Sequence, residues 1–129
     1  MGLGHIAQAA VLPAFEHARS NSSLCALVSG DATKRRKLSR KYGAPAFGYD
    51  DFDGLLASGD VDAVYLAVPN HLHCDYTERA ARAGVHVLCE KPMAVTEDEC
   101  LRMIRAASEA DVRLMMGDRR ARHRRGVAP

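Results

Sequence analysis

Apolar and polar positions alternate in blocks along the chain, and these blocks predict strands that alternate with helices. Apolar runs bounded by turn residues are typical of buried strands, and they cover 23–30, 61–69, 85–92 and 112–117. Helices are predicted from helical spacing of apolar positions, or from charged runs that end in glycine, over 6–20, 31–45, 50–59, 73–84 and 96–110. A shorter candidate strand lies at 46–49.

Local signals at the ends of these blocks support the assignments. Pro13 lies inside the first helical block, where we expect it to bend or interrupt the helix. Gly43 and Gly84 end two later helices, as glycine often does. Thr96 stands three residues before Glu99, which is the capping-box spacing at the start of a helix.

Strands and helices that alternate at short intervals imply a parallel sheet covered by helices on both faces. This is the doubly wound α/β architecture. The length of 129 residues suits one domain and is short for two. We expect this domain to cover residues 1–117.

The chain opens with the stretch MGLGHIA, in which Gly2, Gly4 and Ala7 have the spacing of a dinucleotide-binding turn. Such a turn follows a strand, whereas here only Met1 precedes it. In the dinucleotide-binding strand order 3-2-1-4-5-6 that first strand is central. We therefore expect an incomplete sheet, in which each unsatisfied backbone group costs about 1–3 kcal/mol. A flexible terminus is the competing interpretation of the glycines.

Charge is distributed unevenly along the chain. The whole sequence has a net charge of +2, yet residues 1–117 hold 13 Lys and Arg against 15 Asp and Glu. The last segment, DRRARHRRGVAP at 118–129, holds five Arg and one Asp. It has no aromatic residue for base stacking and no apolar periodicity. We interpret it as a basic, disordered end and expect no specific nucleic-acid binding.

Composition also favours some cellular locations over others and bears on metal binding. No apolar run approaches the roughly 18 residues of a membrane helix. The start has no signal-peptide pattern, so we expect a cytoplasmic protein without membrane contact, although a missing N-terminal segment would leave a periplasmic parent open. The irregular spacing of four cysteines predicts reduced, mostly buried thiols rather than a zinc site or disulfides: Cys25, Cys74, Cys89 and Cys100.

Polar residues after the strand at 23–30 suit the adenosine end of a dinucleotide. Ser29 ends the strand, and Lys34 begins a helix rich in cations. A hydroxyl with cations suits the 2′-phosphate of NADP, whereas Asp31 would suit the ribose hydroxyls of NAD. The cations at 34–41 could equally form a solvated helix face. We expect NADP to be preferred, with NAD possible.

Two further loops follow strands at the same edge of the sheet. The stretch VPNHLH contains His71 and His73, but a His-x-His pair without a third ligand is seldom a metal site, so we expect no metal. The stretch CEKPMA places Glu90 beside Lys91. These two residues could form a simple ion pair. Alternatively Lys91, partly desolvated and with a lowered pKa, hydrogen-bonds a substrate hydroxyl and assists proton transfer.

Together, GLGHIAQAAVLPAF, LVSGD, VDAVYLAVPNHLH and AGVHVLCEKPMAVTEDEC resemble the N-terminal domain of the Gfo/Idh/MocA oxidoreductases, most of all the glucose-fructose oxidoreductase type. The resemblance covers 2–117 and implies a Rossmann domain that binds NAD(P), with Lys91 as the catalytic lysine. It also implies cofactor contacts from the glycine turn and from the strand ends: Gly2, Leu3, Gly4, His5, Ile6, Ser29, Lys34, Tyr49, Pro69, Asn70, His73, Glu90 and Lys91.

The resemblance assigns these positions to different ends of the cofactor. Ser29, Lys34 and Tyr49 match positions at the adenosine phosphate. Asn70 and His73 match the loop beside the nicotinamide. The reaction implied is a reversible hydride transfer between nicotinamide and a sugar or polyol.

The family has features that this sequence lacks. Members carry a larger second domain that holds the substrate, supplies a catalytic His or Asp and mediates homo-oligomerisation. The arginine-rich end resembles an out-of-frame extension of GC-rich coding sequence. We expect a fragment of a larger enzyme, truncated at both ends, that binds cofactor weakly at best and does not turn over. A noncatalytic nucleotide-binding or interaction module, or a nonfunctional gene remnant, is the alternative.

Overall fold

The computed structural model describes residues 1–117, and the predicted basic end at 118–129 lies outside the described residues. Five parallel strands have the bounds β1 Leu27–Val28, β2 Ala46–Phe47, β3 Ala63–Leu66, β4 His86–Cys89 and β5 Leu114–Met116. They form two sheets, with the orders β1-β2 and β3-β4-β5. Parallel strands joined by helices confirm the predicted doubly wound α/β fold.

The helices fall in the predicted blocks. Their bounds are α1 Leu12–His17, α2 Ala32–Tyr42, α3 Phe52–Ala57, α4 His73–Arg82 and α5 Glu97–Glu109. Three short turns precede helices, namely a π turn at Ala7–Val11 and 3-10 turns at Tyr49–Asp51 and Asn70–Leu72. Thr96 caps α5 as predicted, because its hydroxyl accepts from the Glu99 amide at 3.2 Å. Gly43 ends α2 with a φ of 66°.

Pro13 does not interrupt the first helix. The wider π turn lies just before it, where the Leu12 amide donates to the Ala7 carbonyl five residues back. Pro13 then falls in the first positions of α1, where a missing amide is tolerated. The chain therefore continues from one helical form into the other, instead of breaking at the proline.

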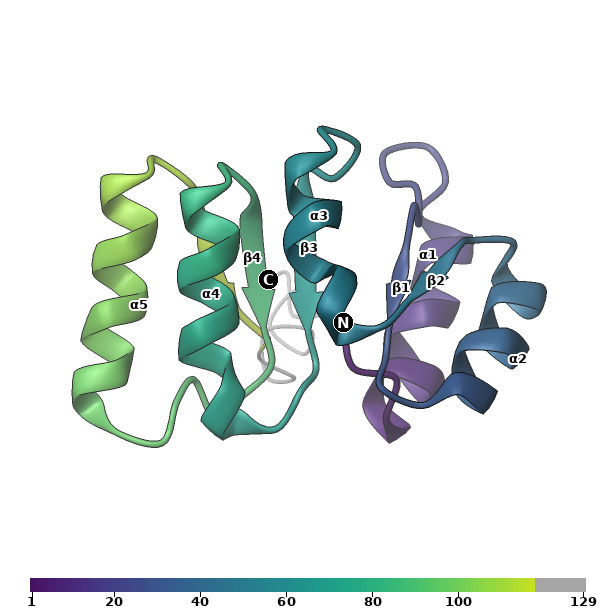
Figure 1. Cartoon of the computed structure of the whole chain (residues 1–129), viewed down its shortest axis with the longest axis horizontal. Helices are drawn as coiled ribbons and strands as arrows, with labels where there is room; N and C mark the ends of the chain where they lie inside the picture. Colours follow the sequence, from purple (N-terminus) through teal and green to yellow (C-terminus); the bar gives the residue numbers. More distant parts are fainter. Residues whose placement is uncertain (118–129) are drawn as a thin grey trace, which may run out of the picture.

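Met1 and Gly2 join the two sheets through backbone hydrogen bonds. The Met1 amino group donates to the Tyr65 carbonyl at 2.7 Å, and the Ala67 amide donates to the Met1 carbonyl at 2.8 Å. On the other side, the Gly2 amide donates to the Val28 carbonyl at 2.9 Å. Figure 1 shows the N-terminus in this position between the strand groups. No strand pairing joins β1 to β3 directly within residues 1–117.

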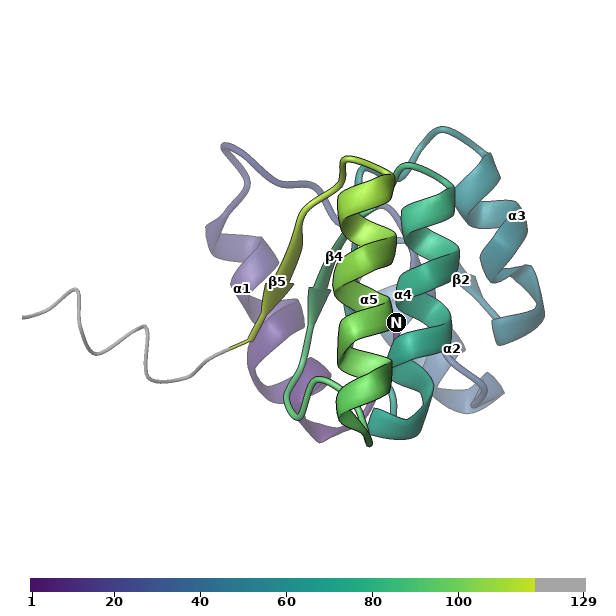
Figure 2. The same ribbon diagram turned by 90° about the vertical axis from the view of Figure 1, so that its left-hand side faces the viewer.

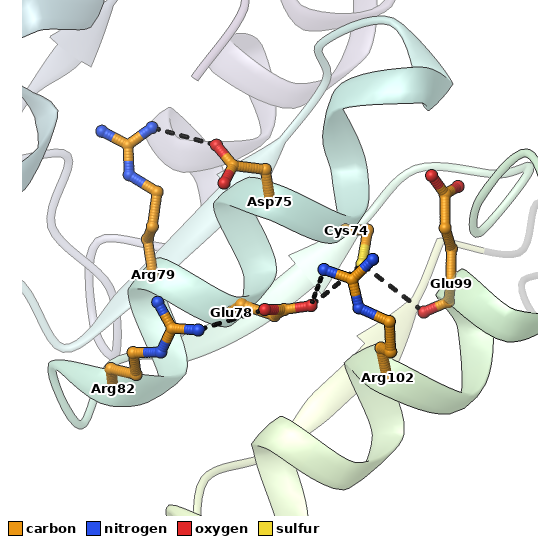
Figure 3. A network of polar contacts seen from close by, with 7 residues as sticks. All are labelled: Cys74, Asp75, Glu78, Arg79, Arg82, Glu99 and Arg102. Atoms are coloured by element: carbon orange, nitrogen blue, oxygen red, sulfur yellow. Dashed lines mark hydrogen bonds and ion pairs between the residues drawn. The ribbon is translucent and has the colours of Figure 1, made fainter.

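The helices cover both sides of the strands. Figure 2 shows α4 and α5 on one side of β4 and β5, with α1 on the other. The packing of α4 on α5 includes a polar cluster, in which Glu78 accepts from Arg102 at 2.7 Å and from Arg82 at 3.2 Å (Figure 3). The larger apolar core lies under these helices, and the fully buried Leu66, Cys89 and Met103 belong to it.

The strand predicted at 23–30 is much shorter in the structure, where only Leu27–Val28 pairs with β2. The preceding Ser23 and Cys25 are exposed. On the facing strand Ala63 is also exposed, although its segment has the strongest strand pattern in the chain. The short β1 and the exposed Ala63 have the same cause. The edges of β1 and β3 face each other with only Met1 and Gly2 between them.

In a chain that begins at Met1, burial lowers the pKa of the amino group from 8.0 to about 5. The unfolded chain therefore binds the proton more readily between these values, and stability should fall as the pH is lowered through this window. The expected slope is at most about 1.4 kcal/mol per pH unit. Denaturant unfolding from pH 8.5 to 5 measures it, with an N-acetylated chain as the control. Parallel stability profiles for the two chains would contradict the prediction.

Candidate functional site

Four loops meet at one edge of the sheets because all five strands are parallel. Figure 1 shows these loops at the lower ends of the strands. They are the glycine turn and the segments that follow β1, β3 and β4, at 2–7, 29–31, 67–72 and 90–94. The fold therefore brings together the segments in which the sequence predicted a site.

The two glycines of the turn have different roles. Gly2 has a φ of 83°, and a Cβ there would lie 2.6 Å from the Ala67 carbonyl oxygen. Only glycine fits this close crossing of two backbone segments. A Cβ on Gly4 would meet nothing within 4 Å, so its backbone faces open space. The helix starts here, with the Gln8 amide donating to the Gly4 carbonyl at 3.1 Å.

The other residues of the turn divide between core and surface. Leu3 is buried and packs in the smaller apolar cluster with Leu12 and Leu27. It can therefore offer a ligand only its main chain, and its carbonyl already accepts from the Gln8 side chain at 2.8 Å. Ile6 is half-buried and His5 is exposed.

Polar side chains gather at the end of β1. Ser29 is buried, and its hydroxyl accepts from the Asp31 amide at 3.1 Å. The Arg35 guanidinium donates to the Ser29 carbonyl at 2.7 Å. Tyr49 lies against Gly30, where a Cβ would be 3.1 Å from its ring. Burial raises the pKa of the Tyr49 hydroxyl, which keeps it protonated.

Arg35, rather than Lys34, is the cation that the structure ties to Ser29. The Lys34 amide donates to the Asp31 carboxylate at 3.1 Å, and the Lys34 charge interacts with the same carboxylate. The same carboxylate oxygen accepts from the Thr33 amide at 2.9 Å, and these bonds lower the pKa of Asp31. The sequence placed Arg35 among possible surface cations. Its position one helical turn after Asp31 was the available signal.

His73 is a buried clamp between two loops. Its Nε2 lies 2.8 Å from the Val68 carbonyl, and its Nδ1 lies 3.0 Å from the Pro92 carbonyl and 3.1 Å from that of Met93. The side chain is 1% exposed. The loop containing His73 is at the predicted edge, but its imidazole contacts protein carbonyls on both sides.

Glu90 and Lys91 differ in their surroundings. Glu90 is half-buried and accepts a hydrogen bond from the Tyr65 hydroxyl. A Cβ on Gly117 would lie 3.2 Å from the Glu90 carboxylate, so the two residues pack closely. Lys91 is exposed, and among residues 1–117 it forms no ion pair with Glu90. The structure therefore does not support a simple Glu90–Lys91 pair. Pro69 is exposed and Asn70 half-buried on the neighbouring loop.

The cysteines are not gathered at this edge. Cys74 and Cys89 are buried, and burial raises the pKa of their thiols to about 11 and about 12. Cys25 is exposed, unlike the predicted majority. Across the described 1–117 range there is no cluster of three metal-ligating side chains. None of the helices in that range is long and apolar enough to cross a membrane.

The edge suits a dinucleotide on three counts. Gly4 leaves open space beside the first amides of a helix, which have no carbonyl partner within that helix and attract phosphate. Arg35 supplies a cation beside Ser29 at the end of β1. Lys91 supplies a second exposed cation after β4. A phosphate-binding turn flanked by cations at two strand ends defines a nucleotide-binding α/β domain.

Comparison of the sequence with models of protein families also indicates a nucleotide-binding α/β domain. The model of the Gfo/Idh/MocA oxidoreductase family, NAD-binding Rossmann fold, matches residues 1–118. The chain belongs to this family and corresponds to its NAD-binding domain.

Three relatives illustrate the match. Aldose-aldose oxidoreductase from Caulobacter crescentus, solved with glycerol, superposes with a TM-score of 0.84 at 45% identity, covering 91% of this chain and 36% of that one. The WlbA dehydrogenase from Bordetella pertussis, solved with NADH and UDP-GlcNAcA, gives 0.82 at 31% identity, covering 89% and 34%. D-xylose 1-dehydrogenase (NADP(+)) 2 from Haloferax volcanii is 35% identical over 115 residues, covering 89% and 34%. The chain thus spans about a third of each relative.

Gly2→Ala and Gly4→Ala form a matched pair that tests the turn. Gly2→Ala should cost at least about 2 kcal/mol of stability, because a Cβ overlaps the Ala67 carbonyl and the φ is positive. Gly4→Ala should leave the melting temperature nearly unchanged but weaken binding of a dinucleotide. Thermal unfolding and isothermal titration with NADPH measure both effects. Equal stability of the two variants would contradict the assignment.

Proposed function

We propose that residues 1–117 form the dinucleotide-binding domain of an NAD(P)-dependent oxidoreductase that acts on a sugar or polyol. One observation carries the proposal: the open backbone at Gly4 and the exposed Lys91 lie on loops at the same edge of the sheets. The names of the relatives support a sugar substrate. Cytoplasmic location and homo-oligomeric assembly stay predictions.

We propose NADP as the preferred cofactor, with NAD as a weaker ligand. Arg35 lies at the end of β1 beside Ser29, where its guanidinium can also contact a 2′-phosphate. The Asp31 carboxylate caps α2, where one of its oxygens accepts from two amides of the helix. Tyr49 borders the same residues, with its ring against Gly30. Among the relatives, one is named for NADP and one was solved with NADH, so the preference rests on this chain's own residues.

Lys91 is the residue we propose to contact the substrate. When bound, the dinucleotide supplies the hydride acceptor or donor. Glu90 accepts a hydrogen bond from Tyr65, whereas Lys91 is exposed and its side chain can donate a hydrogen bond to a sugar oxygen. His73 acts as a positioning residue, since it ties the Lys91 loop to the Val68 carbonyl.

Cofactor preference is testable on the 129-residue chain. NADPH should raise the melting temperature more than NADH at equal millimolar concentration. Arg35→Ala should weaken NADPH binding about tenfold, because a charge-assisted hydrogen bond is lost, and should leave NADH binding nearly unchanged. Arg36→Ala, at the exposed neighbouring position, is the control. A larger effect of Lys34→Ala than of Arg35→Ala would return the phosphate contact to Lys34.

A turnover assay tests whether the 129-residue chain is active by itself. The 129-residue chain should bind NADPH yet show no aldose-dependent reduction of NADP when followed by nicotinamide absorbance. Lys91→Ala should leave the melting temperature within about 1 °C, because an exposed side chain away from packing contributes little stability. Aldose oxidation by the 129-residue chain would contradict the first expectation. If such activity survived Lys91→Ala, the proposed role of the lysine would be wrong.

A further inference from the structure

Three aromatic rings pack together where the turn at Tyr49–Asp51 and α3 meet α4. The Tyr76 ring of α4 contacts the Phe52 ring edge-on, with 5.1 Å between centroids and 86° between planes. The Tyr49 and Tyr76 rings are stacked, at 6.0 Å and 30°. Phe52 and Tyr76 are buried, and Tyr49 is half-buried. Because stacked and edge-on arrangements are the favoured ones for aromatic pairs, Tyr76 ties the Tyr49 ring to the apolar core.

Arg79 joins these rings to two carboxylates at the surface. Its guanidinium lies 4.8 Å from the centroid of the Tyr76 ring and 5.4 Å from that of Phe52. Its Nε donates to the Asp53 carboxylate of α3 at 2.8 Å. Its Nη1 donates to the Asp75 carboxylate of α4 at 3.2 Å (Figure 3). The two carboxylates therefore hold a cation over the ring faces, which attract it.

Tyr49 also contacts the end of β1. A Cβ on Gly30 would lie 3.1 Å from the Tyr49 ring, so the ring packs closely on that backbone. The preceding Ser29 carbonyl accepts from Nη1 of Arg35 at 2.7 Å. A Cβ on Gly48, the residue before Tyr49, would lie 3.9 Å from the same nitrogen. The Arg35 guanidinium thus lies close to two backbone segments that both adjoin Tyr49.

We propose that Tyr76 and Arg79 are positioning residues for the binding of NADP. They hold the Tyr49 ring against Gly30, and the backbone segments beside that ring hold Arg35 for the 2′-phosphate. The inference rests on the proposed function, in which Arg35 contacts this phosphate. An arginine favours NADP over NAD through hydrogen bonds of defined geometry, so its anchorage affects the preference. Loss of Tyr76 or Arg79 should lower the fraction of molecules that have Arg35 in place, and the affinity for NADPH falls with that fraction.

Arg79→Ala and Arg82→Ala form a matched pair on α4. Each variant loses an arginine that forms a surface ion pair, since Arg82 donates to Glu78 at 3.2 Å, and Arg79 lies in addition over the aromatic rings. Arg79→Ala should weaken NADPH binding by about threefold or more and NADH binding by less. Arg82→Ala should leave the ratio of the two Kd values unchanged. Isothermal titration of the 129-residue chain with each dinucleotide measures this ratio, which a general loss of stability would not change.

Two substitutions of Tyr76 test the aromatic contact separately. Tyr76→Phe keeps the ring and should retain the wild-type ratio of Kd values. Tyr76→Leu removes the ring and should lower the preference for NADPH by about threefold or more. The conservative variant therefore distinguishes the stacked ring from the tyrosine hydroxyl.

The Tyr49 ring reports its own position without a dinucleotide. In a chain that contains isotope-labelled tyrosine, the magnetic resonance signal of the Tyr49 ring is assigned with Tyr49→Phe. This signal should shift in Arg79→Ala and stay in place in Arg82→Ala. An unchanged Tyr49 signal in Arg79→Ala would overturn the inference.

The binding data separate this inference from the proposed function. If the wild-type chain bound NADPH, but Arg79→Ala and Arg82→Ala had the same ratio of Kd values, the positioning role alone would be wrong. Equal losses of affinity for NADPH and NADH in Tyr76→Leu would also contradict it. If the wild-type chain bound neither dinucleotide, the proposed function would be wrong and the inference would fall with it, whatever the Tyr49 signal showed.

Discussion

The backbone bonds of Met1 and Gly2 are the interaction on which the rest of the structure depends. They lie between β1 and β3 and satisfy carbonyl or amide groups of both strands. Without them, the β1-β2 pair and the three-stranded sheet would have no shared hydrogen bonds among the strands of residues 1–117. The same two residues set the direction of the glycine turn. The stability of the sheet and the position of the candidate site therefore share one short backbone segment.

At the carboxyl edge, main-chain contacts organise the site more than side-chain pairs do. His73 holds the loop after β3 against the loop after β4 through three backbone carbonyls. Tyr65 engages Glu90, so Lys91 is the residue of that loop with an exposed charge. This division of roles explains how adjacent residues of opposite charge can serve different purposes. Glu90 anchors the loop, and Lys91 faces solvent.

The sequence predicted most elements because their signals are local. Thr96 before Glu99 and the glycine after α2 mark helix ends through backbone hydrogen bonds within a few residues. Sequence-based prediction was less successful where an element or a contact depends on other segments of the fold. The strand predicted at 23–30 shortened to two residues, because only Leu27–Val28 pairs with β2. Pro13 was accommodated by a π turn that no simple periodicity predicts. Arg35 was not distinguished from nearby cations, because only its contact with Ser29 separates them.

By itself, the sequence determined the α/β class, and it predicted a phosphate-binding glycine turn and a chemical role for Lys91. The class follows from periodicity and the turn from its glycine spacing, whereas the resemblance to the family singled out Lys91; none of these requires knowledge of distant contacts. Only the tertiary structure decided that His73 clamps two loops and that Arg35 lies at Ser29. Arg35 lies only six residues from Ser29 and His73 lies 19 residues from Pro92, yet in each case packing and hydrogen bonding select one partner from several that are equally plausible by sequence.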